Sequence, residues 1–105
     1  MAVTPEGRVK KKISEYLASV PGLWYHMAVP CGFGKPTLDY TICYRGFYFA
    51  VEAKAPGKPL KPHQELVADN MRAAGGAVFI VDGTADFPLQ PVKDHVAYLG
   101  TLPPP

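Results

Sequence analysis

The sequence predicts an α/β domain in the order α-β-β-β-α-β plus a terminal helix, with a mixed central sheet flanked by helices. Three observations support this class. Apolar residues recur at helical spacing near the N-terminus, two β-rich runs flank Arg45-Gly46, and a short apolar run follows Gly75-Gly76. The 105 residues suit one domain with a modest core. We expect a single domain over residues 1–105, with a loose Pro-rich tail at 101–105.

The first helix is predicted to begin at Thr4-Pro5-Glu6, which supplies an N-cap, a proline at the first position and an acid in the first turn. Its buried stripe consists of Val9, Ile13, Tyr16, Leu17 and Val20. Pro21-Gly22 ends the helix. A strand over 23–29 and a loop over 30–36 follow.

The two runs 38–44 and 47–54 predict a β-hairpin, although Arg-Gly is a weaker turn signal than Asn-Gly. A two-residue or four-residue loop would place Asp39 opposite Glu52, whereas a bulge would not. Opposed residues have Cβ atoms about 4.5–5.5 Å apart. Lys54 follows Glu52 by two residues and so points to the same face. The second face is apolar and must be covered: Tyr40, Ile42, Tyr44, Phe47, Phe49, Val51 and Ala53.

The remaining elements follow from turn signals. A loop rich in Pro, Gly and Lys spans 55–62, and a helix is predicted over 63–74, ended by Gly75-Gly76. Residues 77–81 predict a buried strand. A short helix is predicted over 92–99.

The net charge of +2 is unevenly distributed. Residues 1–62 hold nine basic and four acidic residues, whereas residues 63–105 hold two and five. A basic surface beside the acidic pair favours a polyanionic partner such as nucleic acid. The run Lys10-Lys11-Lys12 can equally be the solvated face of a helix.

Composition also excludes some classes of protein. No apolar run approaches the roughly 20 residues of a membrane span, and no hydrophobic signal region is present at the N-terminus. Cys31 and Cys43 have no metal-binding or redox spacing, so we expect free thiols in the cytoplasm.

The opposed carboxylates predict a divalent-metal site. Mg²⁺ takes oxygen ligands and usually binds one or two carboxylates, which Asp39 and Glu52 supply, and the carbonyl of Ala53 is a further candidate ligand. Lys54 would orient water or offset charge on the phosphorane. We do not assign it as the base, because two carboxylates favour its charged form. The alternative is a solvated, charged sheet edge.

Two further polar residues are candidates for the same site. Glu6 lies three residues before Val9 and can point towards the sheet, or it can serve the helix dipole. Gln64 shares a helix face with Val67 and Met71 and needs a partner. That partner can be a metal-bound water, a site carboxylate, a DNA phosphate or another core group. We expect five lysines to contact DNA phosphates: Lys10, Lys11, Lys35, Lys58 and Lys61.

Asp39, twelve intervening residues and then Glu52-Ala53-Lys54 resemble the PD-(D/E)xK nuclease superfamily. The stretch 51–60 (VEAKAPGKPL), followed by Gln64 and the Ala-Gly-Gly helix end at 74–76, resembles the VRR-NUC family, the virus-type replication-repair nucleases. The resemblance spans about residues 6–82. Leu38 stands where the superfamily has a proline, which leaves the entry angle of the strand open.

The resemblance implies a restriction-endonuclease-like core and a Mg²⁺-dependent or Mn²⁺-dependent endodeoxyribonuclease. Asp39 and Glu52 would bind the metal, Lys54 would be the catalytic lysine, and Glu6 and Gln64 would match the family's helix acid and glutamine. It also implies a homodimer that resolves four-way DNA junctions in a bacterial cell or phage-infected host, with one site for each of two equivalent strands. The alternatives are a flap, single-strand or restriction-like nuclease, or a DNA-binding module without catalysis.

Overall fold

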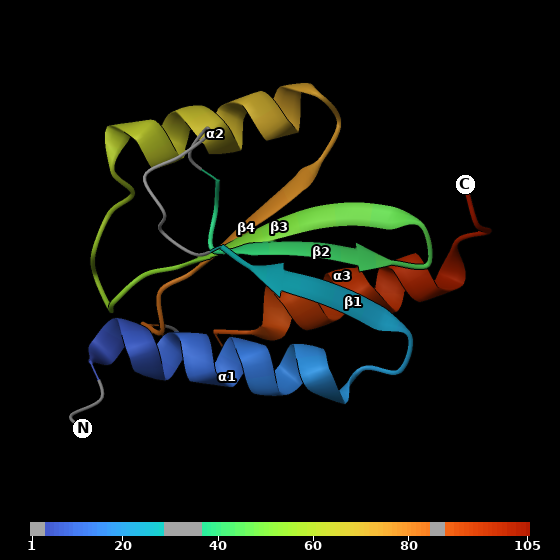
Figure 1. The fold of residues 1–105 in the computed structure, drawn as a ribbon, viewed down its shortest axis with the longest axis horizontal. Coiled ribbons are helices and arrows are strands. Elements are labelled where there is room, and N and C mark those ends of the chain that lie inside the picture. Colours follow the sequence, from blue (N-terminus) through green and yellow to red (C-terminus); the bar gives the residue numbers. More distant parts are fainter. Residues whose placement is uncertain (1–3, 29–36, 85–87) are drawn as a thin grey trace.

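The computed structural model describes residues 4–28, 37–84 and 88–105. The order of elements is α-β-β-β-α-β-α, as predicted (Figure 1). They are α1 (Pro5–Ser19), β1 (Leu23–Met27), β2 (Tyr40–Tyr44), β3 (Phe47–Ala53), α2 (Pro62–Ala73), β4 (Ala77–Val81) and α3 (Gln90–Thr101). The terminal helix is longer than the predicted 92–99 segment. The predicted loop at 30–36, which contains Lys35, lies outside the described residues.

The four strands form one mixed sheet in the order β1-β2-β3-β4. The pairs β1–β2 and β2–β3 are antiparallel, and β3–β4 is parallel. A parallel pair requires a crossover connection, which α2 provides. Within the described ranges, no helix is long and apolar enough to cross a membrane.

The β2–β3 hairpin has the predicted register, with Tyr44 opposite Phe47 and Tyr40 opposite Val51. Arg45 and Gly46 both have positive φ, 54° and 87°, as a tight two-residue hairpin turn requires. Arg45 occupies this unfavourable conformation while its guanidinium donates to the carbonyl oxygens of Gly100 (2.6 Å) and Leu102 (3.1 Å). The turn residue therefore also caps the C-terminal end of α3.

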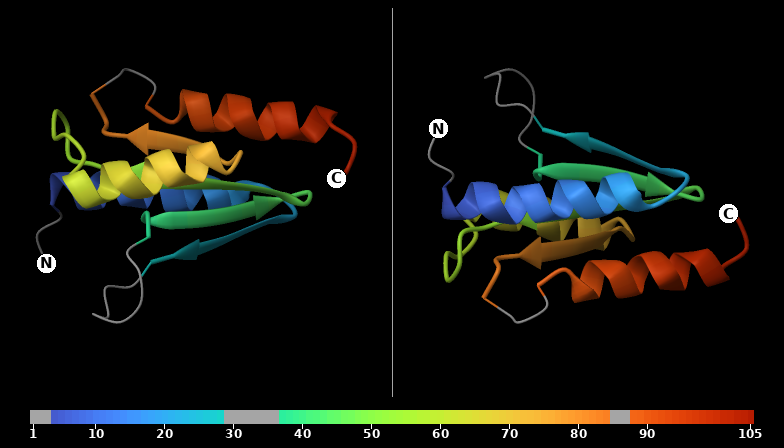
Figure 2. Two further views of the ribbon diagram at one scale, coloured as in Figure 1. Left: turned by 90° about the horizontal axis from the view of Figure 1, so that it is seen from above. Right: turned by 90° about the horizontal axis from the view of Figure 1, so that it is seen from below.

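Helices α1 and α3 cover the apolar hairpin face and enclose the main core (Figure 2). The stripe predicted for α1 supplies Val9, Ile13 and Leu17, all buried. Helix α3 supplies Val92, Val96 and Leu99. The expectation that this face must be covered is confirmed, because Tyr40, Ile42, Phe49 and Val51 are fully buried.

Helix α2 covers only part of the other face. It packs Ala68, Val67 and Met71 on Ala50 and Val78, and Figure 2 (left) shows it over β3 and β4, with β1 and β2 left uncovered. The carboxylates of Asp39 and Glu52 lie at one end of this face, beside the start of α2.

Candidate active site

The antiparallel register brings Asp39 and Glu52 together. Tyr40 opposes Val51, so Asp39, the residue just before β2, stands opposite Glu52 in β3. Asp39 is half-buried, and Glu52 is only 2 % exposed. The two carboxylates thus meet at the edge where the β2–β3 ladder ends.

Main-chain donors fix both carboxylates reciprocally. Oε1 of Glu52 accepts the N–H of Asp39 at 2.9 Å, and Oδ2 of Asp39 accepts the N–H of Ala53 at 2.9 Å. Each acid is therefore held by the strand that carries the other. These bonds to charged acceptors are of the stronger kind, and they offset the repulsion expected of like charges directly opposite in a sheet.

Gln64 holds the second oxygen of Glu52. Its Nε2 donates to Oε2 of Glu52 at 2.8 Å, while its Oε1 accepts the N–H of Lys61 at 2.9 Å. The second bond is the backward reach of a helix capping box, which fixes the amide in the first turn of α2. Of the partners considered from sequence, the structure shows the site carboxylate.

Two ammonium groups flank the acids without forming short hydrogen bonds. Nζ of Lys54 lies 3.9 Å from Oε2 of Glu52, and Lys54 is itself only 6 % exposed. Nζ of Lys10 lies 3.6 Å from Oδ1 of Asp39 and 3.6 Å from Oε2 of Glu6. All three distances exceed the usual hydrogen-bond range, so these contacts are mainly electrostatic.

The structure places Lys10 beside the acids. The sequence offered it as a contact to DNA phosphate or as part of a solvated helix face, and in the structure its ammonium group lies between Glu6 and Asp39. The Tyr40 hydroxyl, which donates to the Lys10 carbonyl at 2.9 Å and pairs with the Ser14 hydroxyl at 2.8 Å, anchors this turn of α1 to the start of β2. The Glu6–Lys10 spacing of four residues was the sequence signal for this pair.

Burial perturbs the titration of the pair. Burial first, and then the negative charge of Asp39, raise the pKa of Glu52 from 4.5 to about 7. A buried carboxylate in this environment is stabilised either by a proton or by a cation. The site therefore favours the binding of positive charge near neutral pH.

The donor set fits Mg²⁺ or Mn²⁺. Among the described residues, no three His, Cys, Asp or Glu side chains gather into a complete ligand set. Mg²⁺ does not require one, because it usually keeps several waters and binds one or two carboxylates together with substrate phosphate. The N–H of Ala53 points to Asp39, and in a strand the carbonyl of the same residue faces the same neighbour. The main-chain oxygen of Ala53 is thus the candidate third oxygen ligand on that side.

The other predicted DNA-contacting lysines that the structure describes have exposed side chains, and Lys61 meets the cluster through its main-chain N–H to Gln64. Lys11 is exposed on α1, Lys58 is exposed in the loop after β3, and Lys61 is exposed at the N-terminal end of α2. Lys35 lies outside the described residues. The structure therefore brings together Asp39, Glu52, Lys54 and Gln64, and it joins Glu6 to them only through Lys10.

Comparison with protein families, curated proteins and solved structures finds no match to this chain.

Proposed function

We propose that this protein is a metal-dependent DNA endonuclease with a restriction-endonuclease-like core, which hydrolyses phosphodiester bonds. The observation that carries the proposal is the Asp39–Glu52 pair, locked by main-chain hydrogen bonds and accompanied by the buried Lys54. A purely structural role does not account for two opposed carboxylates and a lysine at one sheet end. The sequence pattern that resembles VRR-NUC nucleases supports the same assignment.

Each residue has a distinct role in this proposal. Asp39, Glu52 and the Ala53 carbonyl would hold Mg²⁺, which supplies Lewis-acid stabilisation of a phosphoryl displacement and a more acidic water. Lys54 places an ammonium group near the reacting phosphate, where it offsets the developing negative charge. Gln64 orients Glu52, and such supporting contacts around metal ligands commonly affect metal affinity and activity.

The proposed substrate is branched DNA, and the proposed working form is a homodimer. A four-way junction presents two equivalent strands, and a two-fold dimer presents two equivalent sites. This part of the proposal comes from the resemblance to VRR-NUC nucleases. The same site would equally cut a flap or a duplex, so the DNA structure must be tested separately from the chemistry.

The test is cleavage of an immobile four-way junction, a flap and a plain duplex, each with Mg²⁺, Mn²⁺ or EDTA. The variant Asp39→Asn keeps an oxygen that can accept the Ala53 N–H but removes the charge. Asp69→Asn is the matched control, because Asp69 is an exposed acid on α2, 4.0 Å from Arg72 and outside the site. Light scattering of the protein in solution measures its oligomeric state.

We expect paired, symmetric nicks in the junction that require metal, disappear in Asp39→Asn and persist in Asp69→Asn. Cleavage of the flap or duplex in place of the junction would retain the nuclease and reject the junction substrate. A monomer in solution would reject the dimer. Junction binding with no cleavage of any DNA would indicate a binding module and reject the proposed catalysis.

A further inference from the structure

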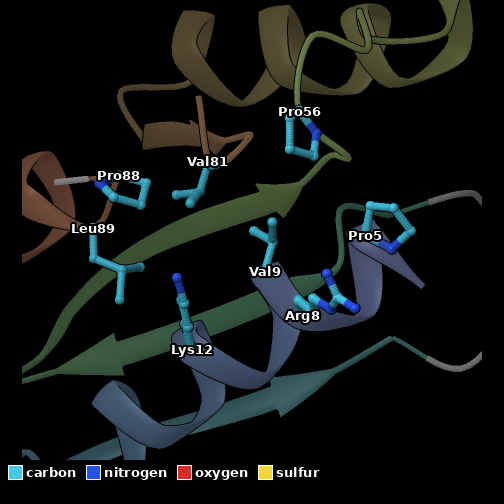
Figure 3. A pocket seen from close by; sticks show the side chains of 9 residues that line it. Pro5, Arg8, Val9, Lys12, Pro56, Val81, Pro88 and Leu89 are labelled. Carbon is cyan, nitrogen blue, oxygen red and sulfur yellow. The ribbon is translucent and has the colours of Figure 1, made fainter. Parts of the chain in front are cut away.

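A small pocket lies on the α1 side of the same sheet end (Figure 3). Its volume is about 170 Å³. Val9, Pro56, Val81 and Leu89 form an apolar wall, and Arg8 and Lys12 line the same pocket from α1. Figure 3 shows the Lys12 ammonium group between Leu89 and Val9, and Arg8 between Val9 and Pro5. The pocket therefore combines two cations with an apolar surface.

The two cations lack an acidic partner in the part of the chain that the structure describes. Arg8 and Lys12 are one helical turn apart, so they are neighbours on α1 and repel each other. The acid in the first turn, Glu6, pairs with Lys10 on an adjacent face. An anion bound at Arg8 and Lys12 would relieve this repulsion.

Two connections along the main chain place the pocket close to the candidate active site. The carbonyl of Val81, which lines the pocket, accepts the N–H of Lys54 at 2.9 Å. Pro56 follows Lys54 by two residues, which span at most about 7 Å of extended chain. A DNA strand with its scissile phosphate at the carboxylates would therefore pass close to the pocket.

We propose that this pocket binds one nucleotide of the DNA strand beside the scissile phosphate, with a phosphate at Arg8 and Lys12 and the sugar or base on the apolar wall. This inference depends on the proposed function for the identity of the strand. The volume equals about five or six water molecules and falls below the 300–1,000 Å³ typical of larger ligands. It admits one sugar or base, and the combined cationic and apolar lining favours a nucleotide over a simple anion.

The test uses deoxyadenosine 5′-monophosphate as a probe, titrated in EDTA into ¹⁵N-labelled protein and followed by NMR. We expect the amide signals of Val9 and Gly83 to shift. Inorganic phosphate alone and deoxyadenosine alone should bind at least tenfold more weakly. The double variant Arg8→Gln/Lys12→Gln should lose at least tenfold in affinity for the mononucleotide. The variant Lys93→Gln, which removes an exposed charge from α3 outside the pocket, should retain the wild-type affinity.

A second readout uses junction DNA in EDTA, measured by fluorescence anisotropy at several salt concentrations. Loss of one phosphate contact should reduce the slope of log affinity against log salt by about one in the double variant and not in Lys93→Gln. An unchanged slope, an equal loss in Lys93→Gln, or no signal shift with the mononucleotide would overturn the inference. Inorganic phosphate binding as tightly as the mononucleotide would also overturn it, because the pocket would then be an anion site alone.

The two proposals fail separately. Asp39→Asn should abolish cleavage while mononucleotide binding at the pocket persists. Normal cleavage by the Arg8→Gln/Lys12→Gln variant with unchanged DNA affinity would reject the pocket and keep the nuclease. Mononucleotide binding without cleavage of any DNA would reject the nuclease and keep the pocket.

Discussion

The raised pKa of Glu52 predicts an unusual dependence of stability on pH in the absence of metal. The folded-state pKa, about 7, lies above the ordinary value of 4.5. Between these values the folded protein holds a proton that the unfolded chain has released, so stability falls as pH rises. The loss of folding stability begins above about pH 4.5 and is complete above about pH 7. At 1.36 kcal/mol per pKa unit, the change between pH 5 and pH 8 is about 2.5 kcal/mol.

The variant Glu52→Gln removes this titration while keeping the shape of the side chain. Its amide oxygen can accept only one of the two bonds now made to Asp39 and Gln64, which costs about 1 kcal/mol at every pH. Relative to wild type, the variant should therefore gain about 2.5 kcal/mol between pH 5 and pH 8. The variant is compared with wild type at each pH because a second group also changes stability in this range. Burial lowers the pKa of His95, so His95 destabilises the fold as pH falls. This opposes the effect of Glu52 below about pH 6.5.

The assay is urea unfolding in EDTA at half-unit intervals from pH 5 to pH 8. Glu65→Gln is the control, because Glu65 is an exposed acid on α2 that makes no contact with the carboxylate pair in the described residues. Mg²⁺ at pH 8 should then stabilise wild type, by about 2.7 kcal/mol at a hundred times its dissociation constant, and should leave Glu52→Gln nearly unaffected. A difference between wild type and Glu52→Gln that stays flat over this range would refute the reasoning.

Three further predictions separate chemistry, ligand positioning and fold. The variant Lys54→Met should reduce the cleavage rate by at least about 100-fold, while Mg²⁺ still stabilises the fold at pH 8. A cleavage rate within tenfold of wild type would exclude a direct catalytic role for Lys54. Gln64→Leu removes the donor to Glu52 and should weaken Mg²⁺ binding about 10–100-fold in calorimetry, so unchanged affinity would show that the amide does not position the ligand. The variant Arg45→Ala loses two hydrogen bonds at the end of α3, which should lower the free energy of unfolding by about 1–2 kcal/mol and leave metal affinity unchanged. Equal stability of the variant and wild type in urea would contradict the capping role.

The hairpin shows what sequence can predict here. The two-residue alternation of a strand and the length of the turn together fix the register, so the opposition of Asp39 and Glu52 followed from counting. The apolar residues on the opposite face identified the covered side of the sheet by the same rule. The helix predicted over 63–74 is observed at Pro62–Ala73, and in both Gln64 lies in the first turn.

Contacts between distant segments cannot be predicted by counting residues in this way. Arg45 is a weak turn signal by itself, and the hydrogen bonds that favour it in the turn are made to the end of α3, more than 50 residues away. The place of Lys10 depends on how α1 packs over β2, which the Tyr40 hydroxyl determines across 30 residues. The pocket at Arg8 and Lys12 likewise requires α1, the loop after β3 and the start of α3 to converge. Local spacing indicates the Glu6–Lys10 pair but none of these contacts between distant segments.

The site separates the positioning of its carboxylates from the neutralisation of their charge. Uncharged donors fix the acids at 2.8–2.9 Å: the main-chain N–H groups of Asp39 and Ala53, and the amide of Gln64. The lysines stand farther away, at 3.6 and 3.9 Å, on flexible stems. A bound divalent cation can therefore replace ammonium charge beside the acids without disturbing the bonds that orient them. In the proposed nuclease this arrangement would keep the two carboxylates oriented for metal before any metal binds, while Lys10 offsets the charge of Asp39 from 3.6 Å away.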